Sequence, residues 1–397
     1  MRDAAAPVRF VPFGRHTRYM LAGYLRHVSI VTLVLLAVAL TIDLWPQLQQ
    51  VSASRGQGDL AAIWNVLRFS ALRTPGLIAP FLSFATFLGV FWTEVVHTQS
   101  GERMLVWNSG RSPAQCLAPV VLLGLILGAV EFVLDAYLGP AAMAVQMHER
   151  LGRDGPRLDR TRWSETSWIA LPGGLLRAEV EYGPPPVLHR LTYFKRDAAG
   201  HLTELDMAAV GRLKPGTDLW TMQQGYSWRE KAAPGSGDAS RSVVELGSST
   251  SETMTPFATR TIRLDLDPAW LGVFGMEAQY IPFATLQKVA RSEQGPEAKS
   301  LYRTRLQMLY GEMVLPGAMA LLAALLSMLL MAYGTSTVAL IGIVFAGYLA
   351  HFGTKACLLM GQTGSLSPLL AGWLVPAALL LASLSVLGVI EKKRKGR

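Results

Sequence analysis

The sequence contains few charged residues for its length. Of 397 residues, 16% are Asp, Glu, Lys or Arg, whereas 51% are hydrophobic. An ordinary soluble protein carries about 25% charged residues. This scarcity argues against a soluble protein and favours the membrane class.

Cysteine is also scarce. Cys116 and Cys357 are the only two in the chain, and the topology derived below puts them near opposite membrane faces. We therefore expect no disulfide between them and interpret both as small apolar fillers. A domain outside the membrane would have to be stable through its own core and its hydrogen-bonded sheet.

Several catalytic motifs are missing. The chain has no G-x-x-x-x-G-K-[ST] loop, whose amides and lysine would hold ATP, and the nearest string, Gly353–Lys355, lacks the glycines. It also has no H-E-x-x-H and no G-x-S-x-G string. We predict a non-catalytic protein that binds no cofactor or metal directly, so that any ATP would be used by a partner subunit.

The net charge of +9 lies almost entirely in the two ends of the chain. Gly139–Arg303 is nearly balanced, with 20 Lys and Arg against 19 Asp and Glu. This distribution predicts two cytoplasmic termini and argues against nucleic-acid binding, which would need a basic face on a folded domain. The N-terminus lacks the pattern of a cleaved secretory signal, so the first apolar segment should remain attached. The terminal basic residues are Arg2, Arg9, Arg15, Arg18, Arg26, Lys392, Lys393, Arg394, Lys395 and Arg397.

Six apolar segments are long enough to cross a bilayer, which requires about 20 helical residues. Pro75 and Pro80 make the second segment irregular, and Leu60–Ala71 before it reads as an amphipathic lead-in. The segments are Val28–Trp45, Thr74–Val96, Ala118–Leu138, Met308–Met331, Thr337–Leu359 and Leu366–Ile390.

These segments predict a membrane α-helical fold with three helices, an insert and three further helices. With the N-terminus inside, His97–Pro113 and the turn Tyr333–Ser336 are cytoplasmic and the insert is periplasmic. The predicted domains are 1–138, with a cytoplasmic coupling helix at about 94–111, then 139–303 and 304–397.

The insert has the character of a β-rich domain. A short helix (Ala141–Leu151) precedes alternating runs separated by Gly, Pro and Asp turns, and a Gly/Ser-rich loop (Ala232–Ser251) interrupts them. A helix at Pro282–Gly295 leads back to the membrane. We predict a small β-sandwich or an open jelly roll. The predicted strands are Ser167–Leu171, Leu175–Tyr182, Val187–Lys195, His201–Ala209, Leu219–Gln224, Arg241–Leu246 and Thr259–Leu266.

Several stretches of the sequence, taken together, are typical of one protein family. They are Ser100–Gly110 (SGERMLVWNSG), Leu191–Leu202 (LTYFKRDAAGHL) with Trp220, Leu266–Gln279, Ile281–Leu286 and Tyr302–Pro316.

In these stretches, and in its architecture over essentially the whole length, the chain resembles the LptF/LptG permease family. The resemblance implies one half of a lipopolysaccharide exporter in the bacterial inner membrane. The implied partners are a paralogous six-helix half (LptF-like), a cytoplasmic ATPase dimer (LptB-like), a periplasmic bridge protein (LptC/LptA-like) and the lipopolysaccharide itself. Asp43 and the spacing from Leu266 to Pro316 look more LptG-like than LptF-like.

One departure from the family concerns basic residues. Members often carry them on the outer half of the first helix, where they are thought to attract lipid phosphates, and Leu33–Leu44 has none. Arg55, Arg68 or Arg73 could substitute, or the partner half could supply the charge.

Cationic side chains near the outer ends of the spans are candidates for binding lipid phosphates, which arginine and lysine favour. Lys355 is the leading candidate. The alternative is that these residues reach to the interface and anchor helices. The candidates are Arg73, Arg305, His351 and Lys355.

Acidic residues inside spans are costly and indicate function or pairing. Glu131 and Asp135 lie four residues apart on one helix face and could face Arg305 or a basic group of the partner, or lie at a solvated helix end. Glu312 is deeper in the fourth span and could make a structural hydrogen bond. Asp43, near the outer end of the first span, is the fourth acidic candidate.

The segment Glu94–Arg111 could form a docking helix for an ATPase, with its apolar side in a groove. In the family this segment is the coupling helix, and Glu102 occupies its acidic position. The alternative is a loop on the headgroups with Trp107 as the anchor. The candidate coupling residues are Glu94, Glu102, Arg103, Met104, Leu105, Trp107 and Arg111.

Two rival functions remain at this point. An intramembrane lipid-modifying enzyme could use Glu131, Asp135 and His351, although carboxylates serve as acid and base only if they converge on one substrate atom. A mechanotransmitting ABC permease that moves no lipid through its own helices would more often have four spans.

Overall fold

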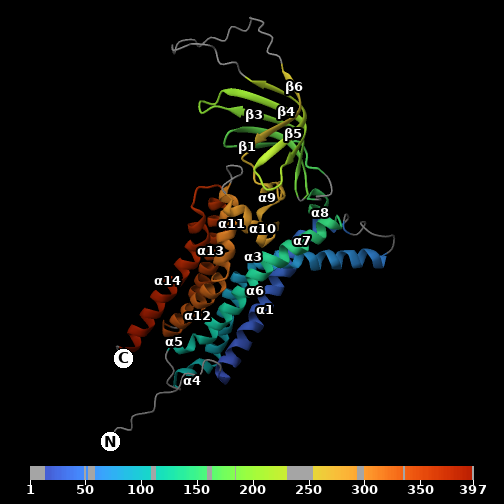
Figure 1. Ribbon diagram of the computed structural model, residues 1–397. Helices are drawn as coiled ribbons and strands as arrows, with labels where there is room; N and C mark the ends of the chain where they lie inside the picture. The colour runs from blue at the N-terminus through green and yellow to red at the C-terminus, as the bar shows by residue number, and fades with distance from the viewer. Residues whose placement is uncertain are drawn as a thin grey trace. The chain divides into compact units, whose positions relative to one another are not determined.

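The computed structural model describes residues 14–48, 51, 59–108, 113–158, 163–183, 185–229, 254–292, 299–333 and 336–395 (Figure 1). Contacts divide the chain into two compact units. The mostly helical unit 1 comprises Met1–Arg157, Glu277–Gln287 and Ser300–Arg397, and unit 2, which holds the sheet, comprises Leu158–Met276 and Lys288–Lys299. Residues 139–157, which we expected in the β-rich domain, thus belong to the helical unit.

Unit 1 contains the membrane spans. In the part of the chain that the structure describes, five helices are long and apolar enough to cross a bilayer. A sixth span arises if Ser300–Glu312 and Leu315–Leu330, which meet at a bend of 47°, count as one. The predicted membrane α-helical fold with an inserted β-domain is confirmed. The five helices are Arg15–Gln47, Leu60–Gln99, Ala118–His148, Thr337–Gln362 and Pro368–Lys392.

The first two spans are longer than predicted. Helix α1 (Arg15–Leu44) begins thirteen residues before the expected start and continues into the 3-10 turn η1 (Trp45–Gln47). Helix α3 (Asp59–Gln99) joins the predicted lead-in to the predicted span, with Pro75 and Pro80 inside it. Proline lacks an N–H donor and bends a helix rather than always ending it. Figure 1 accordingly shows the first part of α3 running in a different direction from the rest.

The third span also passes its predicted end. Helix α6 (Ala118–Val133) continues through the π-helical turn η2 (Leu134–Leu138) into α7 (Gly139–His148), with the short α8 (Asp154–Arg157) beyond it. Between the second and third spans lie two short helices, α4 (Glu102–Asn108) and α5 (Pro113–Cys116).

The remaining helices are close to the prediction, except that the fourth span is broken. Residues 313 and 314 separate its two parts, which places Glu312 at the bend. The helices are α11 (Lys299–Glu312), α12 (Leu315–Tyr333), α13 (Thr337–Gln362) and α14 (Pro368–Lys395).

Helix α12 occupies the centre of unit 1 and contacts α3, α6 and α14. Helix α6 approaches the fourth span closely. A Cβ on Gly128 would lie 2.0 Å from the backbone oxygen of Met313, in the break, and one on Gly124 would lie 2.4 Å from the Cα of Gly317 on α12. Gly124 and Gly128 form a G-x-x-x-G pair, the small-residue spacing that lets membrane helices approach closely. Here it seats α6 against the broken fourth span.

The strands of unit 2 form one antiparallel sheet in the order β1-β2-β3-β4-β5-β6. Each described strand pairs with its neighbour in sequence, so the sheet is a meander rather than two sheets packed as a sandwich. The predicted strand Arg241–Leu246 lies outside the described residues. The strands are β1 (Ser167–Leu171), β2 (Gly174–Glu181), β3 (Val187–Arg196), β4 (Leu202–Leu213), β5 (Leu219–Arg229) and β6 (Thr255–Arg263).

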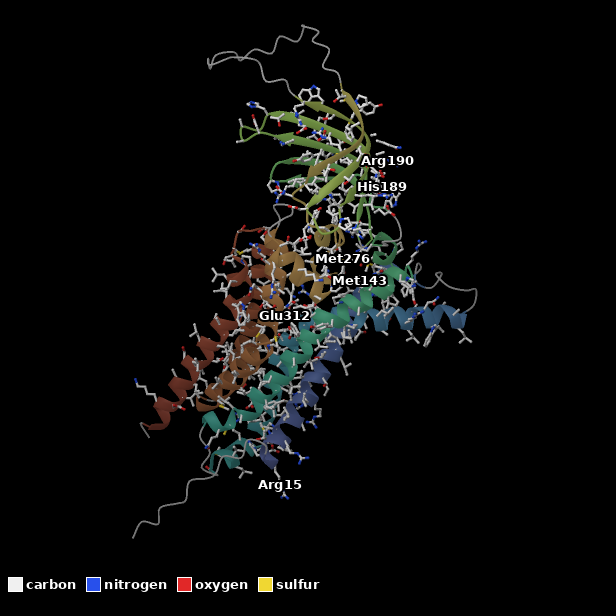
Figure 2. The ribbon with its side chains drawn as sticks, in the orientation of Figure 1. Arg15, Met143, His189, Arg190, Met276 and Glu312 are labelled. Carbon is white, nitrogen blue, oxygen red and sulfur yellow. The ribbon has the colours of Figure 1, made fainter. Side chains whose placement is uncertain are left out.

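A crease crosses the middle of this sheet. Arg190 on β3 and Gln224 on β5 have φ values of 46° and 55°, in the left-handed region that non-glycine residues rarely adopt. Around Arg190 the buried positions change from Leu188 to Leu191, so the strand's alternation reverses phase. The same face is thereby buried on both sides of the crease. Figure 2 labels Arg190 beside His189 in the sheet.

Three short elements follow β6. Helix α9 (Pro268–Leu271) is capped by the side chain of Asp267, which accepts from the amide of Ala269 at 2.8 Å. The turn η3 (Ala278–Tyr280) and helix α10 (Phe283–Arg291) come next, and α10 matches the helix predicted before the fourth span.

Candidate functional sites

A polar cavity of about 220 Å³ lies within unit 1. Its walls come from α3, η2, α7, η3, α11 and α13. The charged residues that line it are Arg73, Asp135, Arg305, Glu312 and Lys355. The cavity therefore gathers three of the four predicted phosphate-binding residues and two of the four predicted acids.

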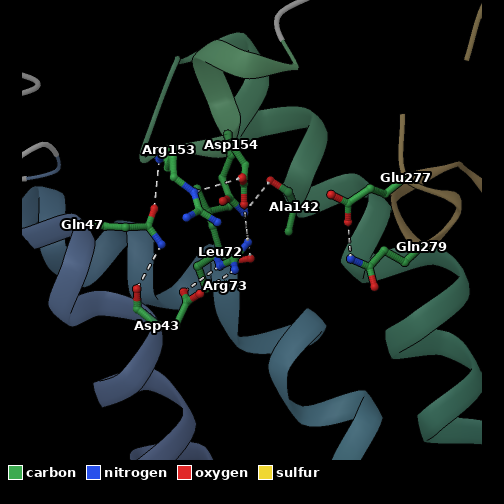
Figure 3. A network of polar contacts seen from close by, with 10 residues as sticks. Asp43, Gln47, Leu72, Arg73, Ala142, Arg153, Asp154, Glu277 and Gln279 are labelled. Atoms are coloured by element: carbon green, nitrogen blue, oxygen red, sulfur yellow. Dashed lines mark hydrogen bonds and ion pairs between the residues drawn. The ribbon is translucent and has the colours of Figure 1, made fainter. Parts of the chain in front are cut away.

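Arg73 is held by acidic neighbours. Its Nε and Nη2 donate to the two carboxylate oxygens of Asp43 at 2.8 and 2.6 Å, and its Nη1 lies 3.6 Å from Asp154 (Figure 3). Gln47 bridges the same region by donating to the backbone oxygen of Asp43 and accepting from the amide of Arg153. These bonds tie the end of α1 and the turn η1 to α3 and to the start of α8, so the charge of Arg73 is already compensated.

Arg305 is buried and faces the predicted acids. Its Nη2 lies 2.7 Å from Asp135, and its Nη1 lies 3.8 Å from the Oε1 of Glu312. The pairing that we considered for Asp135 is thus present. Glu131 takes a different partner, since its Oε2 accepts a hydrogen bond of 2.6 Å from Ser83. Figure 2 labels Glu312 and the buried Met143, which both line the cavity.

Lys355 and His351 occupy different surroundings, although they are one turn apart on α13. The His351 ring stacks on Phe81 and Phe84, with centroids 5.9 and 5.5 Å away. Lys355 lines the cavity and, within the described residues, has no carboxylate partner at ion-pair distance. The lipid-modifying alternative would need Glu131, Asp135 and His351 to act together. In the structure each of these side chains contacts different partners.

A second cluster lies where α4 meets α1 and α3. The buried carboxylate of Glu94 on α3 forms an ion pair with Arg103 on α4 and accepts a hydrogen bond from Tyr24 on α1. Burial lowers the pKa of the Arg103 guanidinium from its usual value. This one carboxylate therefore joins three helices.

Glu102 makes a second connection between the same helices. Its carboxylate lies 2.6 Å from the Nδ1 of His97 and accepts hydrogen bonds from the hydroxyl of Tyr19 at 3.3 and 3.2 Å. Met104 and Leu105 remain 65% and 71% exposed. Helix α4 is thus held by its charged residues and presents two large apolar side chains outward. The Trp107 side chain, Arg111 and Arg55 lie outside the described residues.

Unit 2 contains a charged cluster that the sequence analysis did not single out. On the buried face of the sheet, Arg260 of β6 forms ion pairs with Glu204 and Asp206 of β4, and Arg229 of β5 donates to Glu204 at 2.8 Å. Burial acts to raise the pKa of Glu204, but the hydrogen bonds and charges of Arg229 and Arg260 lower it overall. Burial raises the pKa of Asp206. Lys195 of β3 lies 3.6 Å from Glu204, so the cluster links four strands.

Other partners were also missed at the sequence level. Tyr24, His97 and Ser83 are ordinary polar residues in apolar helices, and only the fold shows that each contacts an acid. The G-x-x-x-G spacing of Gly124 and Gly128 was a readable signal for close helix packing.

The chain matches the family described as lipopolysaccharide export system permease LptF/LptG over residues 18–388, which is nearly its whole length. A comparison with curated protein sequences gives no significant match. The apolar helices and the inserted sheet agree with the architecture of such a permease. The chain therefore belongs to the LptF/LptG family of lipopolysaccharide export permeases, multi-pass proteins of the inner membrane.

Proposed function

We propose that this chain is the LptG-like half of an ABC-type exporter that extracts lipopolysaccharide from the inner membrane and passes it to a periplasmic bridge. A paralogous LptF-like half completes the permease, and a separate LptB-like ATPase dimer drives it. The chain itself is non-catalytic. The basic ends support a topology with both termini in the cytoplasm and the sheet in the periplasm.

The geometry of α4 carries this proposal. An ATPase can move a permease only by gripping an element that is accessible on one side and firmly attached on the other. Helix α4 meets both conditions, because Met104 and Leu105 are exposed while Arg103 and Glu102 bind α3 and α1. An exposed apolar pair on a short helix suits a groove in a partner protein. Movement of α4 would then reach the first two spans directly.

Lys355 is our proposed contact for a lipid phosphate. Arg73 and Arg305 are compensated by carboxylates, so their proposed role is to hold helices together, whereas Lys355 lines the cavity and makes no ion pair within the described residues. An ammonium group without an ion-pair partner can attract a phosphate without first breaking an ion pair.

Reconstitution tests the proposal. The chain would be co-expressed with a candidate second half and an ATPase, purified in mild detergent and placed in proteoliposomes that contain lipopolysaccharide. We expect a stable three-component complex that releases lipid to an acceptor only with ATP. Met104→Asp and Leu105→Asp should abolish recovery of the ATPase while leaving the two permease halves together. Recovery of a homodimer without any nucleotide-binding subunit would refute the proposal.

Topology can be tested separately. Single cysteines placed at exposed sheet positions such as Trp168 and Tyr226, in a chain with Cys116→Ala and Cys357→Ala, should react with a membrane-impermeant maleimide in cells whose outer membrane is permeabilised. A cysteine at Met104 should react only after the inner membrane is opened. The reverse pattern would show that the sheet is cytoplasmic and would overturn the export route.

A further inference from the structure

We propose that the carboxyl groups of Asp135 and Glu312 form a binding site for one proton, at the point where the fourth span is broken. The site lies in the wall of the polar cavity, and its ligand is a hydrogen ion held between two buried carboxyl groups. This inference goes beyond lipid export and does not depend on it.

The unpartnered oxygen of Glu312 is the first observation. The residue is 8% exposed, its Oε2 is buried without a hydrogen-bond partner, and its Oε1 lies at the long distance of 3.8 Å from Arg305. An ionised carboxylate with an unpartnered oxygen is expensive to bury, and more so in a membrane span. A protonated Glu312 would turn that oxygen into a donor.

Asp135 is the candidate acceptor for this donor. One guanidinium brings the two carboxyl groups together, since Nη2 of Arg305 lies 2.7 Å from Asp135 and its Nη1 lies 3.8 Å from Glu312. Two carboxylates beside one cation repel each other when both are ionised, and one shared proton would replace this repulsion with a bond. Arg305 lies 2.7 Å from Asp135 but 3.8 Å from Glu312, so we place the proton on the more weakly paired Glu312.

The surrounding charges support a deficit of one positive charge. Among the described residues, Arg305 is the ion-pair partner of both Asp135 and Glu312, so two ionised carboxylates would share one guanidinium. Lys355 lines the same cavity without an ion pair to either of them. Arg73, on α3, is taken up by Asp43 and Asp154. The other titratable groups near the site are His351, on α13 and against Phe81 and Phe84, and Tyr280, on η3. A neutral imidazole and a neutral phenol carry no positive charge, so neither residue offsets the second carboxylate.

Glu131 is the competing position for the proton. Its Oε2 accepts a hydrogen bond of 2.6 Å from Ser83, whereas the Oε2 of Glu312 has no partner. A metal ion is the competing ligand. The described residues contain no group of three or more His, Cys, Asp and Glu side chains arranged to hold one. The geometry therefore favours a proton on the Asp135–Glu312 pair.

The position of the site indicates how the proton could be released. Asp135 lies on the π-helical turn of the third span, and Glu312 is the last residue of α11 before the 47° bend. π-Helical turns and broken spans often occur at functional sites in membrane proteins. A motion about the bend that separates the two carboxyl groups would remove the shared bond and release the proton.

Infrared spectroscopy tests the site without any transport assay. The purified full chain, in nanodiscs at neutral pH, should show the absorption band of a protonated carboxyl group, and the band should shift in D2O. Glu312→Gln and Asp135→Asn should each lose the band. Glu131→Gln and the exposed Glu165→Gln should keep it. Size-exclusion chromatography and circular dichroism would establish that each variant is folded.

Each contrary result overturns the assignment. If the wild-type protein shows no band of a protonated carboxyl group, the site holds no proton. This result does not depend on whether any variant folds. A band that is lost only in Glu131→Gln moves the proton to Glu131. Loss of the wild-type band in sodium chloride, but not in choline chloride, would show that the pair binds sodium instead. None of these outcomes bears on whether the protein exports lipid.

Discussion

Arg103 on α4 and Glu94 on α3 form a buried ion pair, and the hydroxyl of Tyr24 on α1 donates to the same carboxylate. Removing one partner of a buried pair leaves an uncompensated charge and costs about 3–5 kcal/mol. The short helix is therefore attached to two spans by a contact that is hard to break in isolation. This attachment distinguishes α4 from a loop that merely rests on the membrane surface.

We predict that Arg103→Met weakens the connection between ATP hydrolysis and lipid release. The variant keeps the exposed Met104 and Leu105 and should still bind the ATPase. Helix α4 would no longer be fixed to Glu94, so hydrolysis should continue while lipid release per ATP falls at least several-fold. Both quantities can be measured in the same proteoliposomes.

A charge exchange provides the control for that prediction. Glu94→Arg combined with Arg103→Glu should restore part of the lost lipid release, because the pair is rebuilt with reversed polarity. Equal losses of hydrolysis and release in Arg103→Met would show that Arg103 serves ATPase binding rather than attachment.

Close packing between α6 and the broken fourth span leads to a second prediction. Gly128→Ala places a methyl group 2.0 Å from the backbone oxygen of Met313, so the helices must separate. We expect destabilisation of about 1–3 kcal/mol, the usual range for overpacking. Gly342→Ala on α13 is the matched control, because a Cβ there meets nothing within 4 Å. Thermal unfolding in detergent would compare them, and equal melting temperatures would contradict the predicted contact.

The first part of α3 provides a third prediction. Leu60, Ile63, Trp64 and Leu67 recur at helical spacing and are 57–84% exposed, whereas Phe69 on the other side is buried against Val51 and Leu151. Such a face is typical of a helix lying in the headgroup layer, where tryptophan is enriched. The arm should therefore contact lipid.

Fluorescent labelling can check this contact. An environment-sensitive label on single cysteines at positions 60, 63, 64 and 67, with Cys116 and Cys357 replaced by alanine, should be quenched by lipids that carry a spin label near the headgroup. Labels at positions 65 and 69 should not be. Protection of the outward positions only when the second permease half is present would assign the face to that protein instead.

Composition and periodicity predicted much of the fold because they report burial directly. The apolar segments located the spans, and β1 was predicted with its observed bounds. The depth of Asp135 and Arg305 even suggested their contact across 170 residues of sequence. Two kinds of feature were not predictable. The prolines of α3 bend the helix without ending it, and Arg103, which reads as part of a polar surface, is buried because Glu94 lies opposite. Both depend on tertiary partners that no local pattern reveals.

The charged cluster of the sheet gives a pH-dependent prediction. The pKa of Glu204 is lowered in the folded state, so its contribution to stability is present above the usual pKa of a glutamate, about 4.3, and is lost as the pH falls through the lowered value. Glu204→Gln removes this contribution. Hydrogen bonds to charged groups contribute about 1.5–3 kcal/mol, so we expect a loss of that size at pH 7 and a smaller one in acid.

Hydrogen exchange in β4 and β5, corrected for intrinsic rates, would measure the difference between Glu204→Gln and the wild-type full chain at each pH. Asp206 acts in the opposite direction, since burial raises its pKa and its protonation favours the folded state as the pH falls. It is present in both proteins, so its own titration largely cancels in the comparison. Glu165→Gln, at an exposed position, should match the wild type throughout. A stability difference that is independent of pH would mean that the glutamine disturbs packing and that the charge of Glu204 contributes little.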